Sequence, residues 1–336
     1  MNVHFEVEEF APVTPAQQLV DRFLLGYPRQ GEFHAPGLAV SVHLPGEPEN
    51  PALGRRQPEH GLRRAESLAG ADAAVVVWRG AGARADATRL RRVLEGLPAG
   101  AACFVHGVLG NTLAEAREAV ARAQARKIRL SAVTAAAFGP RLPSVRLLPG
   151  TRRREAFILS PGTAPEAPWE GVVGLLALLD EPPGQWGEPG PVAHARDQAV
   201  WEMFGRGTAP ADLLAAAVSR SDSPLGAPER DGRTQDLAGL GLIPRQAEAA
   251  RLWVVGFPGG FRLVLLAVTG VTRDRCAAWR EGRGRILSTQ LYQPPAPAQE
   301  HFSELAARLE DFLRGGPLPW PLSRSLLAAG LREQLA

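Results

Sequence analysis

Short apolar runs and amphipathic segments alternate regularly over residues 73–133. Residues 73–78 (AAVVVW) and 102–105 are continuously apolar, as expected for strands that are buried on both faces of a parallel sheet. Residues 113–126 carry apolar side chains at helical spacing, and residues 128–133 form a further strand-like run. Strands that alternate with helices at these intervals predict a parallel sheet with right-handed crossovers.

The N-terminal segments extend this pattern. Residues 2–9 alternate between polar and apolar side chains as a strand does, and residues 38–43 form a second strand. Thr14 followed by Pro15 is a helix start signal, and the helix is expected to run to residue 25. We therefore predict an α/β fold with a Rossmann-like domain over residues 1–136.

The rhythm changes after residue 137, where strand-like segments follow one another with fewer helices between them. The Gly259-Gly260 pair between two apolar runs is a hairpin signal. We predict an α+β domain over residues 137–316 with a mostly antiparallel sheet that binds substrate or mediates oligomerisation. Residues 221–245 read as a long loop, and residues 317–336 as a C-terminal helix that packs back between the domains. The expected strands are 144–148, 154–160, 191–196, 251–256, 261–268 and 285–292, and the expected helices lie near 170–180, 198–204 and 210–218.

Composition narrows the function classes. A length of 336 residues suits two domains, and no apolar run approaches the roughly 20 residues of a membrane span. The acidic N-terminus lacks a secretory signal, which predicts a cytoplasmic protein with Cys103 and Cys276 as reduced structural thiols. The formal net charge is only +3, and the arginine clusters contain no interleaved aromatic residues, so nucleic-acid binding is not expected.

Four stretches, 62–78, 103–130, 186–196 and 301–330, resemble the Gfo/Idh/MocA family of NAD(P)-dependent oxidoreductases in the same order along the chain. The motifs LLGYP (24–28), AVWEMF (199–204) and STQLYQPP (288–295) are most similar to a divergent branch of that family. The resemblance implies an N-terminal Rossmann domain that binds NAD(P). It also implies a homo- or hetero-oligomer that pairs through the sheet of the C-terminal domain, in this case with an active family member as one candidate partner.

The sequence departs from the family at each position that carries its chemistry. Residues 1–25 contain no glycine, although a dinucleotide needs glycines for close approach of its pyrophosphate. His43-Leu44-Pro45 stands where the resemblance implies a ribose-binding acid, and His106-Gly107-Val108 stands where it implies a Glu-Lys-Pro triplet with the catalytic lysine. The helix expected at residues 170–180 lacks the family's acid/base histidine, and Lys127 is the only lysine in the chain.

Two histidines are candidates for the site. His106 ends a strand at the carboxyl edge of the parallel sheet, where ligands bind in open α/β folds, so it is either an acid/base on a small polar substrate or a packed core side chain. His301 starts a C-terminal amphipathic helix, where it either reaches a cleft or docks the helix.

Arg324, Gln290 and Tyr292 are the remaining substrate-binding candidates. Arg324 suits a carboxylate or phosphate, or an interdomain salt bridge. Gln290 and Tyr292 share one face of a strand and would line a pocket or an oligomer interface. The histidines His4, His34, His60 and His194 show no metal spacing, so no metal site is expected.

The joint loss of glycines, ribose acid, lysine and histidine favours a protein that has lost ordinary hydride transfer. It would act as a noncatalytic partner subunit or as a small-molecule binder. The alternative is an active oxidoreductase, lyase or isomerase with a remodelled site that uses His106 on a sugar-like or other small polar substrate.

Overall fold

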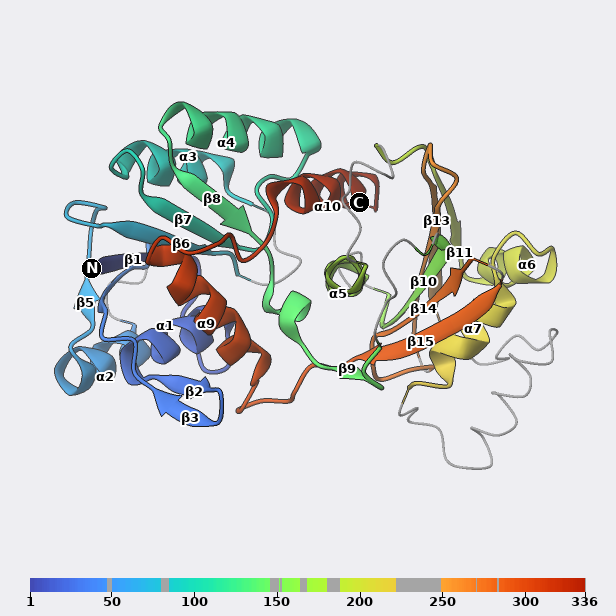
Figure 1. The fold of residues 1–336 in the computed structure, drawn as a ribbon, viewed down its shortest axis with the longest axis horizontal. Coiled ribbons are helices and arrows are strands. Elements are labelled where there is room, and N and C mark those ends of the chain that lie inside the picture. Colours follow the sequence, from blue (N-terminus) through green and yellow to red (C-terminus); the bar gives the residue numbers. More distant parts are fainter. Residues whose placement is uncertain are drawn as a thin grey trace. The chain divides into compact units, whose positions relative to one another are not determined.

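The computed structural model describes residues 1–46, 50–79, 85–145, 151, 153–163, 168–179, 188–221, 249–269, 271–282 and 284–335. The chain divides into two compact units, Met1–Phe138 with Pro294–Ala329, and Gly139–Gln293 with Gly330–Ala336 (Figure 1). Each unit is described by itself. Residues 222–245 of the predicted loop and residues 146–148 of the predicted strand at 144–148 lie outside the described residues, and residues 144–145 are not part of a strand.

Unit 1 is built on a six-stranded sheet in which every pairing is parallel. The order β5-β4-β1-β6-β7-β8 places β1 and β6 at the centre, where their side chains are nearly all buried. This confirms the predicted Rossmann-like parallel sheet. Its strands are β1 (Asn2–Val7), β4 (Ala39–His43), β5 (Arg63–Arg64), β6 (Ala73–Val77), β7 (Ala102–His106) and β8 (Arg129–Ala132).

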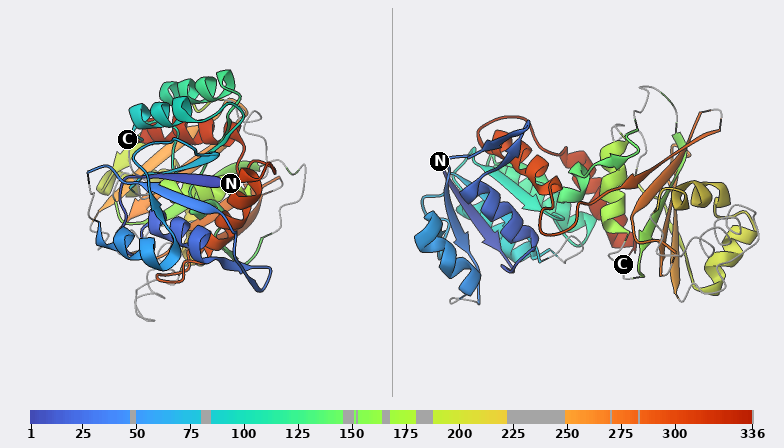
Figure 2. Two further views of the ribbon diagram at one scale, coloured as in Figure 1. Left: turned by 90° about the vertical axis from the view of Figure 1, so that its left-hand side faces the viewer. Right: turned by 90° about the horizontal axis from the view of Figure 1, so that it is seen from below.

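Helices cover both faces of this sheet (Figures 1 and 2). The helices α1 (Pro15–Leu25), α2 (Pro51–His60) and α9 (His301–Leu313) lie on one face, and α3 (Ala87–Gly96) and α4 (Leu113–Ala125) on the other. The start of α4 is a capping box, because Thr112 Oγ1 accepts from the Glu115 N–H at 3.1 Å while the Glu115 carboxylate accepts from the Asn111 N–H at 2.7 Å. The helical spacing found in the sequence over residues 113–126 begins directly after this cap.

A small hairpin, β2 (Tyr27–Arg29) and β3 (Glu32–His34), packs on α9. The contact centres on Glu310, a buried carboxylate that accepts from the Tyr27 hydroxyl at 2.7 Å and lies 2.8 Å from His34 Nε2. The domain boundary predicted at residue 316 therefore differs from the boundary between the compact units, which lies at residues 293–294. Residues 294–316 group with unit 1, because the apolar face and the Glu310 contacts of α9 are satisfied there.

Unit 2 is a mixed seven-stranded sheet in the order β11-β12-β13-β10-β14-β15-β9. The pairing of β10 with β13 is parallel and the others are antiparallel, which agrees with the predicted mostly antiparallel sheet. The predicted hairpin at Gly259-Gly260 joins β12 to β13. The strands are β9 (Arg141–Leu142), β10 (Arg153–Pro161), β11 (Val192–Arg196), β12 (Ala250–Gly256), β13 (Arg262–Val268), β14 (Cys276–Glu281) and β15 (Arg285–Leu291).

Helices lie on both faces of this second sheet as well. The helices α6 (Gln198–Gly205) and α7 (Ala211–Val218) bury one face, and α5 (Trp169–Leu178) packs on the other (Figure 1). A Cβ at Gly171 would lie 2.5 Å from the Ile158 side chain, so the absence of a side chain there allows α5 to approach β10 closely. The last helix, α10 (Leu322–Leu335), contributes residues to both units, and its predicted position between domains stays a prediction.

Two sequence-based expectations concern the chain as a whole. Within the described residues, no helix combines the length and apolarity that a membrane crossing requires. Cys103 and Cys276 are buried free thiols, and burial raises the pKa of Cys103 to about 12, as expected for structural cysteines.

Candidate functional site at the carboxyl edge of the parallel sheet

Parallel strands end at one edge of a sheet, and in open α/β folds ligands bind at that carboxyl edge. In unit 1 the edge is formed by the ends of β1, β4, β6 and β7 and by the segments that follow them. We therefore built the candidate site from these four strand ends.

The turn between β1 and α1 uses its own side chains to satisfy its backbone donors. Thr14 Oγ1 accepts from the N–H groups of Ala11 and Gln17, both at 3.4 Å. Gln17 Oε1 accepts from the Val13 N–H at 2.9 Å. Pro12 and Pro15 have no N–H, and the N–H groups of Ala11, Val13 and Gln17 are bonded within the turn, so few donors are left for a phosphate at this helix N-terminus.

Carboxylates occupy the same turn. Glu8 Oε2 accepts from the Arg79 N–H at 2.9 Å, and Glu8 Oε1 lies 3.9 Å from the Arg89 guanidinium. Glu9 pairs with Arg79 at 3.5 Å. A phosphate brought to this turn would meet two carboxylates, and the guanidinium groups of Arg79 and Arg89 that could attract it are already paired with them.

The end of β4 contributes His43 to a buried cluster with His4 and Glu6 of β1. Glu6 Oε2 lies 2.8 Å from His43 Nδ1 and 3.4 Å from His4 Nε2, and Arg89 Nε is 3.3 Å from Glu6 Oε1. Burial raises the pKa of Glu6, but the two imidazoles and Arg89 outweigh this effect and hold the pKa below its usual value. The resemblance implies a ribose-binding acid at this strand end. The structure places an imidazole there, with the nearby acid held inside the cluster.

These three residues are the one His/Cys/Asp/Glu group with metal-like geometry among the described residues. The sequence did not predict this group, because its three residues show no metal-ligand spacing along the chain. The strand pairing brings them together. His4 and Glu6 lie on the same face of β1, and the parallel register places Glu6 beside His43 of β4.

His106 ends β7, as expected, and its side chain is 2% exposed. Its Nε2 accepts from the Ala135 N–H at 3.1 Å, and its ring stacks on Phe302 at 5.6 Å. Its Nδ1 has no hydrogen-bond partner within the part of the chain that the structure describes. Burial and then the charge of His301 lower the pKa of His106 to about 3. A neutral, covered ring that caps a backbone donor favours the packing interpretation over an acid/base role.

Trp78, directly after β6, packs against Gly107, the residue that follows His106. Its Nε1–H donates to the Val108 carbonyl at 2.9 Å, and an ideal Cβ on Gly107 would lie only 2.7 Å from Trp78 Cδ1. Gly107 also has a φ of 134°, which L side chains rarely adopt. The position aligned with the family's lysine is therefore one where this backbone accepts only glycine.

The other predicted residues divide between the units. His301 is buried beside Phe302 at the start of α9, and Arg324 lies over the Trp320 ring at 5.2 Å, both in unit 1. Gln290 is buried on the inner strand β15 and Tyr292 follows it, both in unit 2. Their roles in binding stay predictions.

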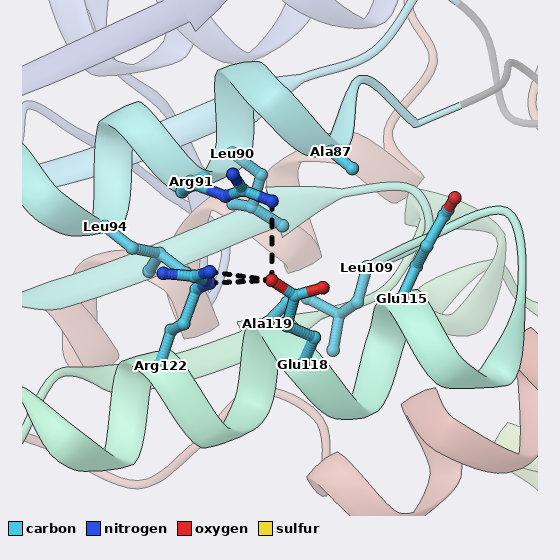
Figure 3. Close-up of a pocket in the computed structure, with 9 residues that line it drawn as sticks. All are labelled: Ala87, Leu90, Arg91, Leu94, Leu109, Glu115, Glu118, Ala119 and Arg122. Carbon is cyan, nitrogen blue, oxygen red and sulfur yellow. Dashed lines mark hydrogen bonds and ion pairs between the residues drawn. The ribbon is translucent and has the colours of Figure 1, made fainter.

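A small hollow between α3 and α4 is a separate feature of unit 1 (Figure 3). Its volume is about 20 Å³, enough for a water molecule, and Glu118 closes it through contacts with Arg91 at 3.4 Å and Arg122 at 2.8 Å. The exposed Arg91–Glu118 pair joins α3 to α4, the Arg122–Glu118 pair lies within α4, and neither marks a ligand site.

Solved structures with this architecture were compared over the whole chain. A myo-inositol dehydrogenase from Lactobacillus casei in complex with NAD(H) and myo-inositol matches with a TM-score of 0.58 and 12% identity, covering 100% of this chain and 94% of its own. The chain has the fold of this dehydrogenase. Biliverdin reductase from Synechocystis, in complex with biliverdin and NADP+, matches with a TM-score of 0.51 and 14% identity over 99% and 98% of the two chains. UDP-N-acetylglucosamine 3-dehydrogenase from Acidithiobacillus ferrooxidans matches with a TM-score of 0.50 and 15% identity over 99% and 96%.

These structural matches establish the fold. Their low sequence identities carry no information on activity. No family model and no curated protein matches the chain. Whether a dinucleotide fits therefore depends on the residues of the site itself.

The residues at the carboxyl edge do not fit a dinucleotide in the ordinary mode. The β1–α1 turn holds carboxylates and occupied donors where the pyrophosphate needs free N–H groups and glycines. The end of β4 holds the imidazole of His43 in place of a ribose-binding acid, and the end of β7 offers Gly107 beneath Trp78 in place of a lysine.

Proposed function

We propose that this chain is a Gfo/Idh/MocA-fold protein that does not carry out NAD(P)-linked hydride transfer and acts as a noncatalytic partner subunit of an active relative. The observation that carries the proposal is the β1–α1 turn, where Thr14 and Gln17 accept from backbone N–H groups and the carboxylates of Glu8 and Glu9 pair with arginines. These hydrogen bonds and ion pairs would have to break before a pyrophosphate could bind at the turn. The burial of His106 supports the same conclusion.

The partner contact is proposed on unit 2, as the family resemblance implies. Because α5 lies on one face of its sheet and α6 and α7 on the other, we place the contact at the edge strand β11, whose residues are largely exposed. An edge strand offers unpaired backbone groups to a second chain.

The experiment mixes the purified chain with an active family member from the same organism. We expect a stable complex in size-exclusion chromatography with light scattering, and a change in the relative's kcat or thermal midpoint. Ala193→Asp, on β11, should weaken the complex, whereas Glu202→Ala, on the solvent side of α6, should not. Coelution without any change in the relative, or no complex at micromolar concentration, would contradict the partner role.

A small-molecule role has one specific observation in its favour. A hollow of about 270 Å³ in unit 2 is lined by Arg220 and Arg285, with Arg220 Nε donating to Ser288 Oγ at 3.0 Å. Two guanidinium groups suit a small anionic ligand. Calorimetry with inorganic phosphate and citrate tests this, and binding that is unchanged in Arg285→Ala would exclude the hollow as the site.

A further inference from the structure

The carboxyl edge of the parallel sheet contains a preorganised donor set that the proposed function does not use. His4 and Glu6 project from one face of β1, and His43 projects from the same face of β4, in direct register with Glu6. His4 and Glu6 are buried, and the His43 side chain is 29% exposed. The three side chains therefore converge from rigid strands, with one route to solvent at His43.

We propose that His4, Glu6 and His43 bind a divalent transition-metal ion, with Zn²⁺ as the best-matched ion. Two imidazoles and a carboxylate are a common zinc donor set, with a fourth position left for water. Metal–ligand bonds of about 2.1 Å in a tetrahedron place donor atoms about 3.4 Å apart. The His4 Nε2 to Glu6 Oε2 distance is already 3.4 Å, the His43 Nδ1 to Glu6 Oε2 distance is 2.8 Å, and all three donor atoms lie within 4.8 Å of one another.

The surroundings orient these donors. The Ser41 hydroxyl lies 3.4 Å from His4 Nδ1, which turns Nε2 of that ring toward the centre of the cluster. Arg89 faces Glu6 Oε1 at 3.3 Å and leaves Oε2 to the two imidazoles. Contacts of this kind fix a ligand's orientation in metal sites.

The local charge also suits a dication. Glu6, Glu8 and Asp86 all lie within 4 Å of Arg89, so three carboxylates face one guanidinium in this part of unit 1. Three carboxylates and one guanidinium leave two negative charges for a bound ion to balance. The positive charge of Arg89 weakens the site, but it contacts the carboxylate oxygen that faces away from the imidazoles.

The test is calorimetric titration of the chelator-treated full chain with Zn²⁺. We expect one ion per chain, an affinity that rises with pH as protons leave the ligands, and a higher thermal midpoint in the presence of Zn²⁺. Co²⁺ in place of Zn²⁺ should give the absorption spectrum of a tetrahedral nitrogen–oxygen site.

Variants locate the site. His43→Ala should lower the Zn²⁺ affinity at least ten-fold, and the exposed His194→Ala in unit 2 is the matched control with unchanged affinity. Glu6→Gln retains the shape of the side chain and should also lose binding, which keeps the test decisive if His43→Ala folds poorly by circular dichroism. Absence of stoichiometric Zn²⁺ binding by the wild type, or equal affinity in His43→Ala and His194→Ala, would overturn the proposal.

Discussion

The indole of Trp78 lies directly over Gly107, so that a Cβ on the glycine would sit 2.7 Å from Trp78 Cδ1. In the family that this chain resembles, the aligned position carries a catalytic lysine. Here the backbone conformation and the covering ring both require glycine. At the position aligned with that lysine, this chain packs the Trp78 indole against a glycine.

We predict that Gly107→Ala destabilises the protein more than Gly100→Ala does. Both glycines have positive φ, but open space surrounds the Gly100 position. The shared backbone strain should cost about 1 kcal/mol in each variant, and the contact with Trp78 should add about 1–3 kcal/mol at Gly107 alone. Urea unfolding measures both, and equal losses would show that Trp78 does not restrict this position.

The pH dependence of stability should report the buried His106. Its folded pKa of about 3 lies below the unfolded value of 6.5, so the unfolded chain takes up a proton first as the pH falls. The contribution of His106 to the free energy of unfolding is fully present above about pH 6.5. Below this pH it falls by up to about 1.4 kcal/mol per pH unit. The variant His106→Gln retains an acceptor for the Ala135 N–H and should show a shallower loss in urea unfolding between about pH 7 and pH 4. Parallel profiles for the two proteins would indicate that the imidazole is hydrated and protonates in the folded state.

The carboxylate of Glu310 should be essential for docking the β2–β3 hairpin on α9. Burial raises its pKa, yet hydrogen bonds with Tyr27, His34 and Arg314 outweigh this and hold the pKa below its usual value. Replacement by Gln removes the charge that these donors stabilise and should cost about 2–4 kcal/mol. The exposed Glu304→Gln, which loses a pair with Arg308, should cost at most about 0.5 kcal/mol. Chemical denaturation compares the two, and similar losses would contradict the buried-network interpretation.

The sequence predicts the elements of this fold better than their long-range packing. Continuous apolar runs such as 73–78 identified the parallel strands, and Thr14 followed by Pro15 identified the start of α1, because these signals are local. The grouping of α9 with unit 1 depends on Glu310 meeting Tyr27 and His34, which lie far away in the sequence. No periodicity along the chain reports such a contact.

The candidate site shows the same limit. The missing glycines of the first turn were visible in the sequence, and His106 was correctly placed at the end of β7. Its burial beneath Phe302 was not visible, because α9 joins the site from the other end of the chain. The cluster of His4, Glu6 and His43 required the register of β1 and β4, which a pattern of single strands does not contain.

The most direct measurement is a nicotinamide-fluorescence titration of the purified chain with NADH and with NADPH, beside the Lactobacillus casei myo-inositol dehydrogenase as a cofactor-binding control. The closed β1–α1 turn predicts no saturable binding of either cofactor up to about 1 mM, while the control binds. Saturable binding with a micromolar Kd would contradict the loss of dinucleotide binding, and with it the proposal of a noncatalytic subunit.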